Sequence, residues 1–157
     1  MAEIVAEHYS AVFRFCARRL GADLAEDAAQ ETFVIAQRVL KNFDGRSKLS
    51  TWLFGIAHNT CRNLARKRRM EMSYENAWME EQSAASPESS VISREALRRA
   101  LAKLTPEHRE AVVLHELDEL TYEEAASVIG VPVGTVKSRL FHAFAQLRRL
   151  LTEEVPA

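Results

Sequence analysis

Residues 120–140 constrain the fold more than any other segment, because they have the pattern of a helix-turn-helix. Ala126 lies four residues before Gly130 and is small enough for a second helix to cross over it. Gly130 stands where the first helix must end in a left-handed turn, which glycine adopts without steric penalty. Pro132 follows near the first position of the next helix, where no amide hydrogen is needed. Apolar side chains should pack between the two helices: Ile129, Val131, Val136 and Leu140.

The second helix of this pair has two faces at helical spacing. The inward face contains Val136, Leu140, Ala143, Phe144 and Leu147. The outward face contains Lys137, Ser138, Phe141 and His142. These outward side chains suit a DNA major groove, because they can meet phosphates, base edges and thymine methyls. A plain helical hairpin with a solvated polar face is the alternative, but solvation explains an outward Phe141 beside Lys137 poorly.

Composition indicates one domain or two small ones in a soluble globular protein. The chain has 157 residues, of which 47% are hydrophobic and 27% charged. No apolar run is long enough for a membrane span, and the start Met1-Ala2-Glu3 lacks the order of a signal peptide. We therefore expect a cytoplasmic protein with no direct membrane insertion. Cys16 and Cys61 form no CxxC pair and are expected to be reduced.

The net charge of −1 hides a segmental distribution of charge. Residues 1–31 carry six acids and three bases, and residues 41–69 carry eight bases and one acid. Residues 71–92 carry five acids and no Lys or Arg. Because DNA affinity depends on neutralising phosphates, a chain this acidic elsewhere should bind duplex DNA weakly by itself. Another component must hold it on DNA.

The helical patterns predict an all-α protein of two small domains joined by a flexible acidic linker. Residues 1–71 contain long helical patterns with one break at 42–47, and no alternating strand pattern occurs in the sequence. Residues 72–92 are polar, acidic and Ser-rich, and are predicted to be the linker. The second domain is 93–157. Its helices resume near Ser93 and continue to about Leu151, with a pause where Thr105 is the expected N-cap and Pro106 the first helical residue.

Two helices of the N-terminal half carry polar faces. The pattern 27–40 places Ala29, Phe33, Ala36 and Leu40 on one face, with Asp27, Gln30, Glu31 and Arg38 elsewhere. By itself this is an amphipathic helix with a solvated face. A second helix, capped by Ser50 or Thr51, should run from Trp52 to Arg69. Its buried stripe would be Leu53, Ile56, Ala57, Thr60 and Leu64, and its basic stripe His58, Arg62, Arg66 and Arg69.

Two features of this half favour nucleic-acid binding. Five of the eight residues 62–69 are Lys or Arg, which favours a nucleic-acid contact over a solvated face or a helix-end charge. Cations and aromatics, with one serine, are interleaved just before the helix, at Lys41, Phe43, Arg46, Lys48, Ser50 and Trp52. Such a mixture is what stacking on unpaired bases requires. Phe43 and Trp52 could equally be core residues, and for Trp52 the core is favoured.

Taken in order, the motifs resemble those of the sigma-70 family. They are Asp-x-x-Gln-Glu-Thr-Phe, Phe-x-Gly-x-Ser, Thr-Trp-Leu-Phe-x-Ile-Ala-x-Asn with a basic run, Leu-x-x-Leu-Thr-Pro-x-x-Arg, Thr-Tyr-x-Glu-x-Ala and Val-Gly-Thr-Val-Lys-Ser-Arg-Leu. The two-domain brevity is similar to that of the extracytoplasmic-function (ECF) group. The resemblance extends from Ala6 to Leu151.

The resemblance implies a role for each of these segments. By this resemblance, the residues that dock on core RNA polymerase are Asp27, Gln30, Glu31 and Phe33. Capture of a flipped base of the minus-ten element falls to the loop containing Phe43, Arg46, Lys48 and Ser50. The resemblance implies that the upstream edge of that element is contacted by a helix carrying Asn59, Arg62, Asn63 and Arg66. The minus-thirty-five element is implied to meet Lys137, Ser138, Phe141 and His142, with Thr135 and Arg139 nearer the backbone.

Further implications concern partners and departures from the family pattern. The linker would thread through the polymerase toward the RNA exit channel, and an anti-sigma factor would control the protein. The loop reads Asp44-Gly45-Arg46-Ser47, where relatives often have a cation before the glycine and an acid after it. His142 stands where arginine is common. Base preference at both elements is therefore open.

Two other functions compete with a sigma factor. A stand-alone helix-turn-helix regulator explains the C-terminal half, but not a second basic and aromatic site, and it would usually dimerise on a palindrome. An enzyme would need a catalytic or metal constellation. The five histidines are scattered without metal-ligand spacing or a nucleophile signature, at positions 8, 58, 108, 115 and 142. We expect no catalysis, cofactor, metal or small-molecule substrate.

Overall fold

The computed structural model describes residues 1–75 and 93–154, and every regular element within these ranges is a helical one. The chain divides into two compact units. The first is built from helices α1 to α3 and the second mainly from helices α4 to α7. The all-α class predicted from the sequence is confirmed. Most of the predicted linker, residues 76–92, lies outside the described residues.

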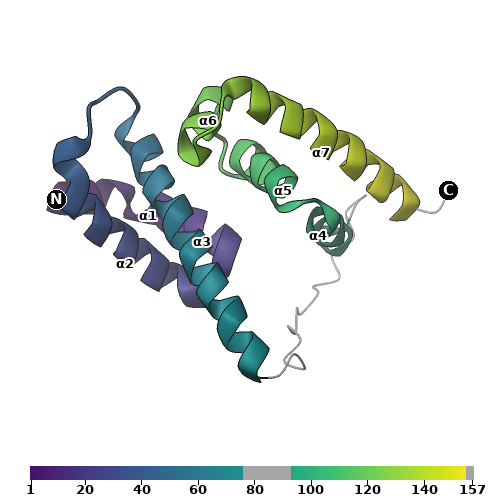
Figure 1. Ribbon diagram of the computed structural model, residues 1–157, viewed down its shortest axis with the longest axis horizontal. Helices are drawn as coiled ribbons and strands as arrows, with labels where there is room; N and C mark the ends of the chain where they lie inside the picture. Colours follow the sequence, from purple (N-terminus) through teal and green to yellow (C-terminus); the bar gives the residue numbers. More distant parts are fainter. Residues whose placement is uncertain (76–92, 155–157) are drawn as a thin grey trace. The chain divides into compact units, whose positions relative to one another are not determined.

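The N-terminal unit is a three-helix bundle of α1 (Ala2–Leu20), α2 (Ala22–Val39) and α3 (Leu49–Glu75). Each of the three helices packs against the other two (Figure 1). Phe15 of α1 stacks on Phe54 of α3, with ring centroids 4.9 Å apart. The buried apolar side chains of these helices are Val12, Phe15, Cys16, Ala25, Ala28, Ala29, Phe33, Ala36, Leu53, Ala57 and Cys61.

The break between α1 and α2 was not predicted. Gly21 has a φ of 82°, its N–H donates to the Ala17 carbonyl at 2.9 Å, and its carbonyl accepts from the Ala25 N–H at 3.2 Å. It therefore ends one helix and begins the next. The expectation of one break in this half was wrong, because Gly21 is an isolated glycine with no other turn residue beside it. The predicted break follows the 3-10 turn Leu40–Asn42.

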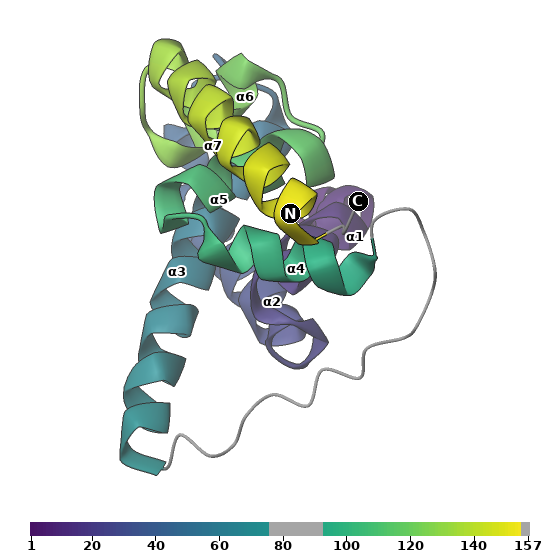
Figure 2. The ribbon, with the colours of Figure 1, turned by 90° about the vertical axis from the view of Figure 1, so that its right-hand side faces the viewer.

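Helix α3 begins and ends beyond its predicted limits. Its first residue is Leu49, and the Trp52 N–H donates to the Lys48 carbonyl at 3.1 Å. Ser50 and Thr51 therefore lie inside the first turn, so their prediction as N-caps was wrong. The helix continues to Glu75, and its C-terminal part extends past α1 and α2 (Figure 2).

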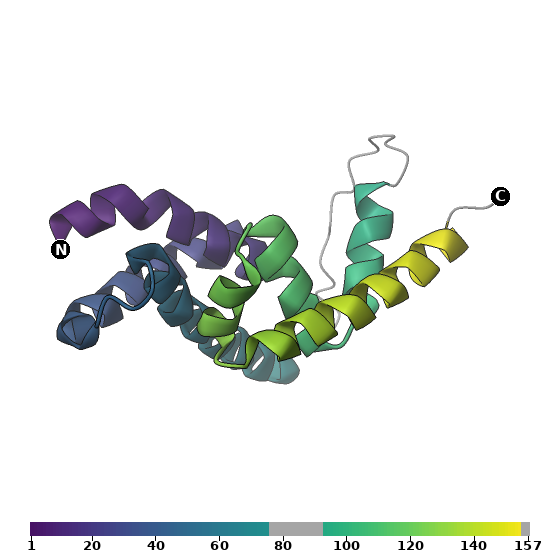
Figure 3. The same cartoon turned by 90° about the horizontal axis from the view of Figure 1, so that it is seen from above.

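The C-terminal unit contains α4 (Arg94–Lys103), α5 (Pro106–Val112), a π-helical segment (Val113–Leu117), α6 (Tyr122–Ile129) and α7 (Val133–Glu154). The long helix α7 packs against α4 and α5 (Figure 3). The core includes Ala100, Leu104, Ala111, Val112, Leu114, Val136, Leu140, Ala143 and Leu147.

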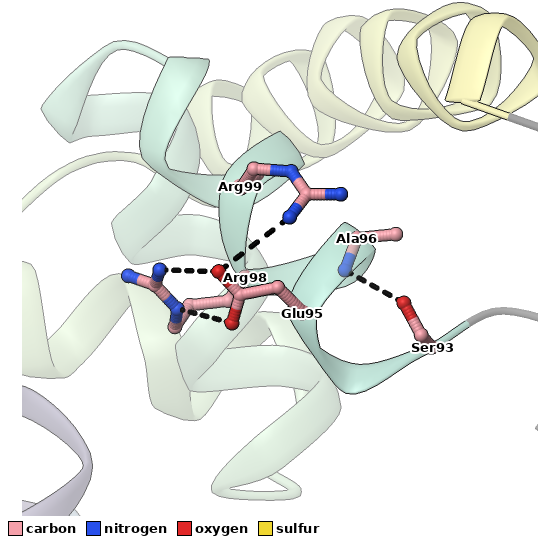
Figure 4. Close-up of polar contacts among 5 residues, drawn as sticks. All are labelled: Ser93, Glu95, Ala96, Arg98 and Arg99. Atoms are coloured by element: carbon pink, nitrogen blue, oxygen red, sulfur yellow. Dashed lines mark hydrogen bonds and ion pairs between the residues drawn. The ribbon is translucent and has the colours of Figure 1, made fainter. Parts of the chain in front are cut away.

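The two helix starts predicted in this unit are confirmed. The Thr105 hydroxyl accepts from the His108 N–H at 3.2 Å, and Pro106 is the first residue of α5. At α4, the Ser93 hydroxyl accepts from the Ala96 N–H at 3.0 Å (Figure 4). Such caps satisfy amides that the helix itself cannot pair.

A charged cluster reinforces the start of α4. Glu95 pairs with the Arg98 guanidinium at 2.6 Å and with that of Arg99 at 3.5 Å (Figure 4). The hydrogen bond from Arg98 holds the pKa of Glu95 below its ordinary value. An ionised acid in the first turn also suits the positive end of the helix dipole.

Candidate nucleic-acid interface

The turn between α6 and α7 has the geometry predicted for a helix-turn-helix. Gly130 has a φ of 74°, and the Val131 N–H donates to the Ala126 carbonyl at 3.1 Å, which closes the end of α6. The Pro132 carbonyl accepts from the Thr135 N–H at 3.0 Å and begins α7. Ala126 is buried, as the crossing of two helices requires. The predicted motif is confirmed.

Helix α7 presents the outward face that its periodicity predicted. Lys137, Ser138, Phe141 and His142 are all exposed. Phe141 has 72% of its surface exposed, although it is a large apolar side chain. Thr135 and Arg139 are half-buried at the edge of this face. Of the predicted inward residues, Val136, Leu140, Ala143 and Leu147 are buried and Phe144 is half-buried.

Three of these outward side chains contact aromatic rings. The Nζ of Lys137 lies 5.6 Å from the centroid of the Tyr122 ring. The His142 ring stacks on that of His108 with centroids 6.2 Å apart, and Phe141 meets His142 edge-on at 5.5 Å. Neither Tyr122 nor His108 was predicted to belong to the site. The motif positions alone do not show which rings lie beside α7.

Arg109 has a structural role that was also missed. Its guanidinium donates to the carbonyls of Leu101 at 3.0 Å, Ala102 at 3.2 Å and Leu104 at 3.0 Å. These carbonyls lie at the C-terminal end of α4, where carbonyls run out of partners within the helix, although that of Leu101 also accepts from the Leu104 N–H at 3.1 Å. Arg109 therefore ties α4 to α5.

The acidic surface of α2 lies on the first unit. Asp27, Gln30 and Glu31 are exposed, and the Gln30 amide donates to the Glu26 carboxylate at 3.4 Å. Phe33 is only 6% exposed and stacks on Tyr9 with centroids 6.1 Å apart. Phe33 is therefore a core residue, on the inward face where the helical pattern placed it.

The loop before α3 combines an aromatic pair with exposed charge. Phe43 and Trp52 are half-buried, with ring centroids 5.1 Å apart and planes inclined by 45°. The Asp44 carboxylate accepts from the Arg46 N–H at 3.0 Å and lies 3.4 Å from the Arg46 guanidinium. Even so, 90% of the Arg46 side chain is exposed. Lys48 is exposed and Ser50 half-buried.

The basic face of α3 begins at Arg62. Asn59, Arg62, Asn63 and Arg66 are exposed, and the Arg66 guanidinium donates to the Asn63 side chain at 2.8 Å. His58 is only 6% exposed, so its assignment to this face was wrong. In this half of α3 the buried arc is wider than one amphipathic stripe and includes Ala57 and His58.

Residues 1–75 and 93–154 contain no group of three or more His, Cys, Asp or Glu side chains that could hold a metal ion. None of the helices in these ranges is both long and apolar enough to cross a membrane. Cys16 and Cys61 are both buried, and neither is part of a disulfide.

Comparison with known proteins decides what these surfaces belong to. Residues 4–71 match the family model of sigma-70 region 2, and residues 94–147 match that of sigma-70 region 4. The protein belongs to the sigma-70 family. The RNA polymerase sigma factor YlaC of Bacillus subtilis is 32% identical over 96% of this chain and 91% of its own. The ECF RNA polymerase sigma factor SigW of the same species is 33% identical over 97% and 89%.

A solved structure agrees with this membership. The sigma factor RpoE, in complex with the anti-sigma factor NepR from Bartonella quintana, has a TM-score of 0.72 and 29% identity. The match covers 96% of each chain. Together with the sequence relatives, it assigns the protein to the ECF group of sigma factors.

Proposed function

We propose that this ECF sigma factor reads both elements of a promoter, with one surface on each compact unit, while bound to core RNA polymerase. The observation that carries the proposal is the outward face of α7, where a cation, a hydroxyl, an imidazole and a 72% exposed Phe141 follow a helix-turn-helix turn. A solvated face would not need the exposed ring.

The minus-thirty-five element is assigned to the start of α7. Lys137, Ser138 and His142 provide donors and acceptors for base edges, and Phe141 provides an apolar surface for a thymine methyl. Thr135 and Arg139, at the edge of the face, are assigned to phosphates. Phosphate contacts fix the register of the helix, and base contacts supply specificity.

The minus-ten element is assigned to the loop before α3 and to the basic face of that helix. Phe43 offers a ring on which an unpaired base could stack, and Arg46, Lys48 and Ser50 follow it in the chain as cations and a hydroxyl that could hold such a base. Asn59, Arg62, Asn63 and Arg66 would follow the backbone at the upstream edge. The exposed Arg46 side chain can move toward DNA at little cost, because exposed ion pairs contribute little stability.

The binding of core polymerase is assigned to the acidic face of α2. Asp27, Gln30 and Glu31 are exposed and can form charged hydrogen bonds with a basic partner. The buried Phe33 would support this face from beneath by packing on Tyr9. Phe33 would therefore contribute to polymerase docking by supporting this face, without touching the partner.

The proposed domains are 1–71 and 93–157, joined by a linker 72–92 whose first residues, 72–75, continue helix α3. Groove sites more than one turn apart are separated by at least about 34–36 Å. Docking of both units on core polymerase would hold the two DNA-binding surfaces at this separation. It would also join two weak DNA contacts into one stable complex. A stand-alone regulator would lack this requirement for polymerase.

Control by an anti-sigma factor completes the proposal. It is supported by the RpoE structure, which holds that sigma factor in complex with NepR. We further propose that the protein acts in the cytoplasm and is not an enzyme, since its role is to place the active site of polymerase. Its histidines, which have no metal-ligand spacing, give no reason to assign chemistry.

Run-off transcription over a pool of genomic fragments tests the proposal. The full chain with core polymerase should yield defined start sites, and core polymerase alone should not. In a gel-shift at physiological salt, the chain alone should bind the recovered promoters weakly. Tight sequence-specific binding by the isolated chain, together with repression of a complete polymerase, would identify a stand-alone regulator instead.

A further inference from the structure

The Tyr122 ring contacts both the π-helical segment and helix α7. The His115 ring stacks on the Tyr122 ring, with centroids 4.8 Å apart and planes inclined by 28°. The Lys137 Nζ lies 5.6 Å from the centroid of the same Tyr122 ring. An ammonium within about 6 Å of a ring centroid is attracted by the negative face of the ring. Tyr122 therefore lies in contact with a side chain assigned to the minus-thirty-five element.

The position of Tyr122 is fixed by the start of α6. The Thr121 N–H donates to the Glu124 carboxylate at 2.9 Å, and the Glu124 N–H donates to the Thr121 hydroxyl at 3.0 Å. This reciprocal capping box determines how the chain enters the helix. Tyr122, the first residue of α6, is held in the middle of it.

The position of His115 is fixed by the π-helical segment Val113–Leu117, which precedes α6. His115 Nδ1 lies 2.9 Å from the Leu120 carbonyl oxygen, and because that oxygen can only accept, Nδ1 carries the hydrogen. The π-helical segment closes with the Asp118 N–H on the Val113 carbonyl at 2.9 Å. Such segments often lie at functional sites. Here the segment places an imidazole against Tyr122.

We propose that Tyr122 is a positioning residue that holds the Lys137 ammonium in place before DNA arrives. The inference rests on the proposed role of Lys137 at the minus-thirty-five element. A lysine side chain loses much rotamer freedom on binding, and restricting it beforehand lowers that loss. Restriction also limits which base edge the ammonium can reach. Tyr122, backed by His115, would thus sharpen preference at the base pair that Lys137 reads.

Nuclear magnetic resonance of the full chain tests the contact without DNA. The Lys137 side-chain signals, assigned by their loss in Lys137→Arg, should shift toward the random-coil position in Tyr122→Leu, which removes the ring current. They should stay in place in Tyr122→Phe, which keeps the ring. Unchanged Lys137 signals in Tyr122→Leu would overturn the proposal. Backbone amide spectra of the same samples show whether each variant remains folded.

Promoter binding tests the consequence. The probe is a duplex promoter recovered by run-off transcription, with a series of single-base changes in its minus-thirty-five element, bound by the full chain with core polymerase. Tyr122→Leu should weaken binding about two- to fivefold and flatten preference at one position. Tyr122→Phe should preserve both. In a Lys137→Ala background, Tyr122→Leu should have no further effect.

The other outcomes separate the possible failures. An equal loss in Tyr122→Phe and Tyr122→Leu would indicate a direct contact of the hydroxyl with DNA and overturn the positioning role. A loss that persists in the Lys137→Ala background would do the same. If Lys137→Ala itself leaves affinity and preference unchanged, the assignment of Lys137 in the proposed function fails, and this inference fails with it. Directed transcription by the unaltered chain would still stand in that case.

Discussion

The imidazole of His142 on α7 stacks on the imidazole of His108 on α5, with ring centroids 6.2 Å apart and planes inclined by 20°. Phe141 meets the His142 ring edge-on, at an interplanar angle of 82°. Two rings therefore restrict His142 before any base is present. His108 contributes from the first turn of the helix that supports α7.

His142→Arg should change which base is preferred in the minus-thirty-five element. A neutral imidazole can donate and accept, whereas a guanidinium only donates, although its plane can still stack on His108. Selection from a randomised element with core polymerase measures the preference. Arg148→Ala, an exposed change two turns further along α7, should return the original motif. The same motif from His142→Arg would mean that His142 does not read a base.

Arg109→Ala should lower the free energy of unfolding of the C-terminal unit by about 1–3 kcal/mol, because three carbonyls at the end of α4 lose a charged donor. Arg109→Lys should restore only part of this, since an ammonium lacks the planar fork of donors. Denaturant unfolding of the full chain, with Arg148→Ala as the control for loss of charge, measures the difference. Equal stability of Arg109→Ala and the control would contradict the capping role.

Local signals predicted the helix-turn-helix well, because Ala126, Gly130 and Pro132 act on neighbouring residues within one turn. The caps Ser93 and Thr105 were predictable for the same reason. These interactions join residues three to five apart, so a short sequence pattern indicates them. Residue type alone is not enough, because Ser50 and Thr51 lie inside the first turn of α3 and do not cap it.

Contacts that depend on how the helices pack could not be predicted from the sequence. Periodicity assigned His58 to an exposed face, but the buried arc of α3 includes it. Arg109 bonds to carbonyls five to eight residues earlier, across a turn. The motif Leu-x-x-Leu-Thr-Pro-x-x-Arg contains this arginine, but the motif does not show where its guanidinium lies. Likewise, periodicity predicted that Lys137 and His142 point outward, but not that rings from α6 and α5 lie beside them. Such neighbours follow from how the helices pack.

Glu119→Asn should preserve or slightly raise stability. Glu119 has a φ of 60°, and outside glycine this left-handed conformation is tolerated best by Asn and Asp. Glu119→Val should lower the free energy of unfolding by about 1–2 kcal/mol, because a β-branched side chain fits this conformation poorly. The control Glu153→Asn, at an exposed helical position, should be mildly destabilising. A lower midpoint for Glu119→Asn than for Glu119→Val in thermal unfolding would show that the left-handed turn does not set the preference.

Removal of Phe43 and Lys48 should impair promoter melting more than polymerase binding. If the loop captures an unpaired base, Phe43→Ala with Lys48→Ala removes the stacking surface and a nearby cation, and base stacking is worth about 1–3 kcal/mol. Phe43 lies against Trp52 with centroids 5.1 Å apart, so it is already placed at the start of α3. Lys41→Ala, on the 3-10 turn just before the loop, is the matched loss of charge.

Permanganate footprinting on supercoiled and pre-melted templates separates melting from docking. With the double variant, the minus-ten bases should lose permanganate reactivity on supercoiled DNA. Reactivity should return on a template whose minus-ten region is already unpaired, because that template no longer needs base capture in order to open. Its binding to core polymerase, which is assigned to the acidic face of α2, should match that of Lys41→Ala. Equal losses on both templates, or weakened polymerase binding, would instead indicate that Phe43 supports the fold through Trp52, and the loop would then have no special part in opening DNA.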